Sequence, residues 1–238
     1  MIRAAAILAA IACVAGGSAS AATRPVVVID PGHDLHANSA TEPIGPGSAR
    51  RKIKDGGGTR GVVSGIREAD LVLDVSLRLR TLLRRAGVKV VMTRTRTAGT
   101  SVGNIARARI ANRVQAALFL RVHADGIASS SVRGTSVLVP ALRPGWTDDV
   151  YRPSVRAGRI LLIELVDALG FPSRGIVERS DFTGFNWADV PVALVELGFM
   201  TNPDEDRQLA TDQVRERAAL ALCRGALRFI RSSPERCG

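Results

Sequence analysis

Two hydrophobic patterns alternate along the chain and predict its secondary structure. Short apolar runs are typical of strands that are covered on both faces of a sheet. They lie at 26–29, 88–92, 117–122, 135–139 and 192–195. Apolar residues spaced three or four positions apart are typical of helices with one buried face. They lie at 68–86, 102–114, 155–169 and 212–230.

This order of strands and helices predicts the fold class. It indicates an α/β protein with a mostly parallel, twisted sheet and helices on both faces. We expect the strand at 135–139 to lie at an edge of that sheet. Residues 143–152 contain Pro, Gly and Asp and predict a loop. A length of 238 residues fits a single domain with a substantial core.

One long segment, 34–66, fits neither pattern. It is polar and rich in Gly, Ser and Arg, and it includes the run Gly56-Gly57-Gly58. Segments of this length without a hydrophobic period are usually functional loops or disordered ones. Its length, glycines and basic residues favour a mobile flap over an active site.

Candidate catalytic residues lie where three predicted strands end. His33 follows the turn signal Asp30-Pro31-Gly32, His123 ends a second strand, and Glu196 ends a third. Sites in α/β sheets collect at the carboxyl ends of strands. Two histidines and a glutamate are a common ligand set for a catalytic zinc ion. Taken singly, His33 also fits a turn residue and His123 a buried histidine bonded to the backbone.

Several segments together resemble the zinc-dependent N-acetylmuramoyl-L-alanine amidases, in the form that consists of a lone α/β catalytic domain. The resemblance covers nearly all of 25–231, and the motifs occur in the family's order. They are Ile29-Asp30-Pro31-Gly32-His33, Arg67-Glu68-Ala69-Asp70 at a helix start, Val90-Val91-Met92-Thr93-Arg94, Ala111-Asn112, Leu118 to Asp125 and Pro191 to Asn202.

The resemblance implies a division of roles among four residues. His33, Glu68 and His123 would bind one zinc ion per chain, and Glu196 would act as general base and acid. The implied reaction is hydrolysis of the amide bond between N-acetylmuramic acid and L-alanine in peptidoglycan or muropeptides. By itself, Glu68 in a first helical turn also fits a carboxylate that complements the helix dipole.

Two residues depart from the family pattern around the third ligand. Arg121 and Asp125 stand where the family usually has a serine and an asparagine, which affects specificity more than activity. The segment 34–66 is longer than the usual connection and resembles actinobacterial members that carry a hairpin beside the active site.

The other polar candidates near these motifs receive lesser roles. His36 is read as a loop residue, with a ligand role in place of His33 as its alternative. Arg109 and Asn112 are expected to brace the site rather than to act in it.

The first residues predict export. Arg3 precedes an apolar run at 4–15, and small residues follow up to Ala21, which is the order of a cleaved secretory signal. The predicted organisation is a signal peptide at 1–21 and a catalytic domain at 22–238, located in the periplasm, the cell wall or outside the cell. A frayed helix and a lipid-attachment role for Cys13 are the alternatives.

Two cysteines remain after the predicted cleavage. Cys223 and Cys237 suit a disulfide in an exported protein, where the short loop between them adds roughly 3 kcal/mol by restricting the unfolded chain. Two free thiols are the alternative.

The formal net charge of +11 comes almost entirely from arginine. It favours anionic partners by long-range attraction, and for an exported chain these are wall polymers rather than nucleic acid. Arginine on solvated faces without a specific site explains it equally well. We expect a monomer. Two other functions stay open, namely a zinc peptidase acting on wall cross-links and a non-catalytic wall-binding protein.

Overall fold

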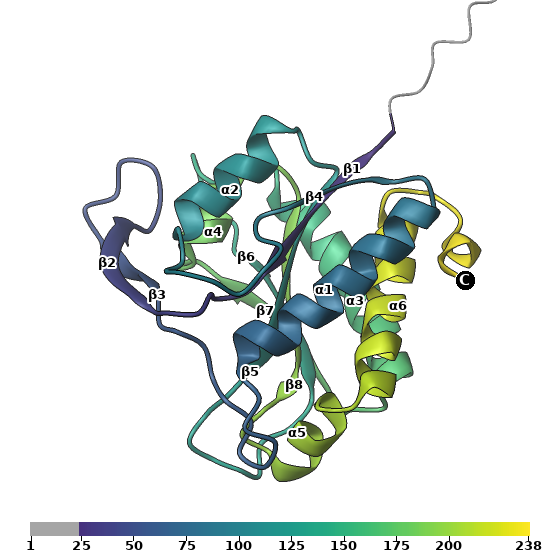
Figure 1. Ribbon diagram of the computed structural model, residues 1–238. Coiled ribbons are helices and arrows are strands. Elements are labelled where there is room, and N and C mark those ends of the chain that lie inside the picture. The colour runs from purple at the N-terminus through teal and green to yellow at the C-terminus, as the bar shows by residue number, and fades with distance from the viewer. Residues whose placement is uncertain (1–23) are drawn as a thin grey trace, which may run out of the picture.

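A six-stranded sheet runs through the middle of the molecule in the computed structural model, which describes residues 24–238 (Figure 1). In sheet order the strands are β4 (Lys89–Met92), β1 (Val26–Pro31), β5 (Leu118–Asp125), β8 (Val192–Phe199), β6 (Thr135–Pro140) and β7 (Ser173–Arg179). Only the β6–β8 pair is antiparallel within this sheet. The prediction of a mostly parallel sheet is confirmed.

Helices cover both faces of the sheet, as predicted (Figure 1). The larger core lies between the sheet and three long helices, which are α1 (Glu68–Arg85), α3 (Tyr151–Leu169) and α6 (Asp212–Phe229). The smaller core on the other face includes residues of α2 (Asn104–Arg113) and α4 (Thr183–Asn186). The short elements α5 (Pro203–Leu209) and η1 (Pro234–Cys237) complete the chain.

The structure differs from two of the predictions made from the sequence. Strand β6 lies inside the sheet, because the unpredicted strand β7 forms the edge beyond it. Helix α3 begins at Tyr151 and so takes the end of the predicted loop. Pro153 fits that helical start, since the first turn of a helix has no acceptor for its N–H groups.

The segment 34–66 contains an antiparallel hairpin formed by β2 (Asn38–Pro43) and β3 (Arg51–Asp55). The hairpin is packed on the body of the protein next to α4. Trp187 donates a hydrogen bond from Nε1 to the Pro43 carbonyl at 3.1 Å, and Asn186 donates one to the Ile44 carbonyl at 2.8 Å. Ile44 is only 2% exposed.

The predicted disulfide is present between Cys223 in α6 and Cys237 in η1, and it ties the C-terminal turn to the helix. Within residues 24–238, no helix has the length and apolar character to cross a membrane. The predicted signal peptide at 1–21 lies outside the described residues.

Candidate functional site

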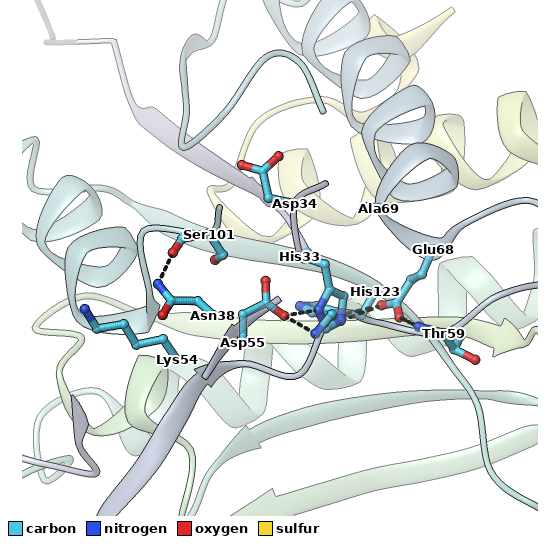
Figure 2. Close-up of polar contacts among 12 residues, drawn as sticks. His33, Asp34, Asn38, Lys54, Asp55, Thr59, Glu68, Ala69, Ser101 and His123 are labelled. Atoms are coloured by element: carbon cyan, nitrogen blue, oxygen red, sulfur yellow. Dashed lines mark hydrogen bonds and ion pairs between the residues drawn. The ribbon is translucent and has the colours of Figure 1, made fainter. Parts of the chain in front are cut away.

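Three side chains from separate parts of the chain converge beside the carboxyl ends of β1 and β5 (Figure 2). His33 follows β1, Glu68 is the first residue of α1, and His123 lies in β5. Each offers one ligand atom, and these atoms all lie within 4.8 Å of one another. Oε1 of Glu68 is 3.2 Å from Nε2 of His33 and 2.9 Å from Nδ1 of His123.

This arrangement fits a zinc ion. Ligand atoms of a tetrahedral site with bonds of 2.0–2.1 Å are about 3.3 Å apart, and the two distances to Glu68 are close to that value. The three donors are two imidazole nitrogens and a carboxylate oxygen, which are the ligand types that zinc binds. The donor set is therefore suited to a metal.

Two glycines allow the ligands to come this close. The ring of His123 lies against Gly32, where a Cβ atom would overlap it. At Gly58, which has φ +71°, a Cβ atom would lie 2.9 Å from the His33 ring and 3.0 Å from Oε2 of Glu68. His33 itself has φ +56°, a left-handed conformation that non-glycine residues seldom adopt outside constrained sites.

A fourth side chain, Asp55 at the end of β3, holds the ring of His33. Nδ1 of His33 lies 2.5 Å from Oδ1 of Asp55, which also accepts a hydrogen bond from the Gly57 N–H. This contact keeps the proton on Nδ1 and leaves Nε2 facing Glu68. Burial lowers the pKa of His33, but the hydrogen bonds to Asp55 and Glu68 outweigh it and raise the pKa to about 9. Asp55 is not among the site residues predicted from the sequence.

Glu68 is fixed by the loop that precedes its helix. Its Oε2 accepts a hydrogen bond from the Thr59 N–H, and its own N–H donates to the Thr59 carbonyl. Asp206 in turn holds that loop by accepting hydrogen bonds from the N–H groups of Val63 and Ser64. Burial would raise the pKa of Glu68, but the two histidines hold it well below its usual range.

Glu196 stands beside the histidines without joining them. It lies in β8 as the register partner of His123. Its Oε2 is buried and has no partner among residues 24–238. Burial, together with the negative charges of Glu68 and Asp125, raises the pKa of Glu196 well above its usual value. A carboxyl group of this kind can carry a proton at neutral pH.

A buried ionic cluster stabilises the loop that carries His33. Asp30 is fully buried and accepts hydrogen bonds from Nη1 of Arg107 at 2.5 Å and from Nε of Arg121 at 2.8 Å. Burial would raise the pKa of Asp30, but the two guanidinium groups hold it far below its usual range. Arg107 also donates to the carbonyls of Pro31 and His33, so the cluster fixes the loop that carries the first histidine.

The remaining residues named from the sequence lie outside the ligand group. His36 donates its backbone N–H to the Gly99 carbonyl. Arg109 lies over the Trp187 ring at 5.7 Å. Asn112 donates to the Trp187 carbonyl at 2.9 Å. Oδ1 of Asp125 accepts a hydrogen bond from the Gly126 N–H.

A cavity of about 310 Å³ opens over these groups. His33, His123 and Glu196 line it, and so do β3 and α4. A pocket of this size can hold a short peptide or one sugar ring. The α/β fold, the group that can hold a metal and the free carboxylate beside it are together typical of a metal-dependent hydrolase.

Comparison with known proteins assigns the family. A family model described as N-acetylmuramoyl-L-alanine amidase matches residues 27–228, and the chain belongs to this family. It is 34% identical over 215 residues to the N-acetylmuramoyl-L-alanine amidase Rv3717 of Mycobacterium tuberculosis, covering 86% of each chain.

Solved structures of the same family share the fold. The amidase Ami1 from Mycobacterium smegmatis matches with a TM-score of 0.79 and 28% identity, over 88% of this chain and 98% of that one. The apo form of Ami1 from Mycobacterium abscessus matches with a TM-score of 0.78 and 26% identity, over 87% and 98% of the two chains.

Proposed function

We propose that the protein hydrolyses the amide bond between N-acetylmuramic acid and L-alanine in peptidoglycan, with one zinc ion bound by His33, Glu68 and His123. The observation that carries this proposal is the convergence of three ligand atoms within 4.8 Å of one another, beside a cavity that His33, His123 and Glu196 line. Membership of the amidase family supplies the substrate class. The role of each residue is inferred from its position.

When bound, zinc supplies a Lewis acid that polarises the scissile carbonyl and lowers the pKa of a bound water. Glu196 removes the proton from the attacking water and delivers it to the leaving nitrogen of L-alanine. Its register with His123 in the sheet supports this role. The raised pKa of Glu196 favours retention of this proton until the amide bond breaks and the leaving nitrogen accepts it.

Two variants separate proton transfer from metal binding. Glu196→Gln keeps the shape of the side chain but cannot accept a proton, so it should retain zinc and lose activity by roughly 10²- to 10⁴-fold. His123→Ala removes one of three ligands and should lose zinc and activity together. Elemental analysis and mass spectrometry of muropeptide products measure both.

Each outcome bears on a separate part of the proposal. A zinc-free Glu196→Gln protein would make Glu196 a ligand, and a fully active one would place the general base elsewhere. Products cut within the peptide cross-links, with the muramoyl–alanine bond intact, would identify a zinc peptidase instead. Binding of wall fragments without any cleavage would identify a non-catalytic wall-binding protein.

The substrate class also supports a location outside the cytoplasm. We infer that residues 1–21 direct export and are then removed, so the mature chain begins at Ala22. N-terminal sequencing of the exported protein tests this, and a mature protein that still begins at Met1 would overturn it.

A further inference from the structure

The side chain of Arg121 lies in the floor of the cavity, one step along the sheet from the proposed metal site. It precedes His123 by two residues in β5, so both side chains point to the same face. Arg121 pairs in register with Leu194, just as His123 pairs with Glu196. All four residues line the cavity.

Two of the three guanidinium nitrogens of Arg121 donate hydrogen bonds within the described residues. Nε donates to Asp30 at 2.8 Å, and Nη2 donates to Oδ1 of Asn104 at 2.8 Å. Nη1 donates no hydrogen bond to any group among residues 24–238. It lies against Gly184 in α4, where a Cβ atom would overlap it. The whole residue is only 5% exposed.

Only one carboxylate among the described residues forms a hydrogen bond with this group. Asp30 is the only carboxylate bonded to Arg121 among the described residues, and it is shared with Arg107. Two buried guanidinium groups therefore share one hydrogen-bonded carboxylate, and Nη1 of Arg121 is left with no hydrogen-bonded carboxylate. Glu196, which lines the same cavity, accepts no hydrogen bond from Arg121. A buried, partly unpaired guanidinium strongly favours a carboxylate ligand.

The position of Arg121 matches the position of a carboxylate in the substrate. Two residues along a strand span about 6.6 Å, which separates Arg121 from the row of His123 and Glu196. In a muramoyl peptide, the α-carboxyl group of the second stem residue lies two residue lengths beyond the scissile carbonyl. That distance is about 7 Å in an extended chain.

We propose that Arg121 is a specificity-determining residue, which binds the free α-carboxylate of the residue that follows L-alanine in the stem peptide. This inference rests on the proposed amidase function. The protein should therefore prefer stem peptides in which this carboxyl group is not amidated.

The test uses two muramoyl tripeptides that differ at one group. In both, the second residue is joined onward through its side-chain carboxyl, and its α-carboxyl is either free or amidated. The zinc-loaded wild-type enzyme should hydrolyse the free acid with a kcat/KM roughly 10- to 100-fold higher, the usual value of a hydrogen bond to a charged group. Arg121→Gln should bring this ratio close to one.

Two further variants provide a second test and a control for the role of Arg121. Gly184→Ala leaves Arg121 in place but pushes its guanidinium aside, so it should also lower the ratio. The control, Arg113→Gln, removes an equal charge from an exposed position of α2 outside the cavity and should keep the wild-type ratio. Gly184→Ala carries the test if Arg121→Gln does not fold.

The outcomes distinguish this inference from the function on which it rests. Equal hydrolysis of both peptides by the wild type would overturn the role of Arg121 and leave the amidase function intact. A preference that survives in a folded Arg121→Gln protein would do the same. Hydrolysis of neither peptide would overturn both.

Discussion

His33 and Asp55 are joined by a contact of 2.5 Å between Nδ1 and Oδ1, which links the β2–β3 hairpin directly to the proposed metal site (Figure 2). The carboxylate is the last residue of β3, and the histidine follows β1. The hairpin is therefore more than a cover for the cavity. It supplies the group that orients the first ligand.

Asp55→Asn should weaken zinc binding without removing a ligand. Asparagine keeps the size of the side chain but is a weaker acceptor, so the His33 ring is held less firmly and its nitrogen is less basic. Loss of such an outer partner typically costs 10- to 100-fold in metal affinity. Competition with a chromogenic chelator measures the dissociation constant.

The matched control is Asp34→Asn, a change in the residue next to His33. Asp34 accepts hydrogen bonds from the N–H groups of Leu35 and Ala98, and its side chain points away from the ligands (Figure 2). The zinc affinity of the Asp34→Asn variant should equal that of the wild type. Equal affinities for Asp55→Asn and the wild type would contradict the positioning role of Asp55.

Shortening the tip of the hairpin should change which substrates are cut. Residues 44–50 join β2 to β3 and dock beside α4 through Ile44. Their replacement by a two-residue turn shortens the hairpin and keeps its cavity-lining residues, which run from Lys52 to Asp55. Activity on intact wall should then rise relative to activity on small muropeptides. An equal change on both substrates, with folding intact, would count against a gating role.

The sequence predicted the central strands well because both of their faces are buried. Strands β1, β5 and β8 are buried at almost every position and apolar at most of them, so each contains a continuous apolar run. The edge strand β7 was missed for the opposite reason. It reads Ser-Arg-Gly-Ile-Val-Glu-Arg and is buried at none of its positions, so no hydrophobic pattern marks it.

The same contrast applies to the site. The three proposed ligands and Glu196 stand in motifs that can be recognised locally, and three of the four also lie at or near strand ends. Asp55 is 22 positions from His33 and has no motif around it, so only the folded chain brings the two together. Asp30 was read as part of a turn signal, and its burial between two arginines depends on tertiary packing.

Breaking the disulfide should lower stability and leave the active site intact. Cys237→Ala removes the cross-link and leaves Cys223 as a buried, small apolar residue. A closed loop of this length contributes about 3 kcal/mol to the free energy of unfolding. Urea unfolding measures the loss, and dithiothreitol should lower the wild type to the level of the variant. An unchanged midpoint would show that the cross-link constrains little.

Because of Asp30, the free energy of unfolding should decrease at acid pH. The two arginines hold its pKa far below the usual value in the folded state, so its contribution is present above the unfolded pKa of about 3.9. It is lost as the pH falls below that value. Asp30→Asn leaves two buried guanidinium groups without their carboxylate and should cost about 3–5 kcal/mol at pH 7.

The difference in unfolding free energy between the wild type and Asp30→Asn should then shrink by about 1 kcal/mol between pH 5 and pH 3. Urea unfolding with chelator present throughout measures this difference without a contribution from metal loss. Asp167→Asn, an exposed change in α3, is the control and should follow the wild type at every pH. If this difference stays constant down to pH 3, the charge of Asp30 does not contribute to the stability of the protein.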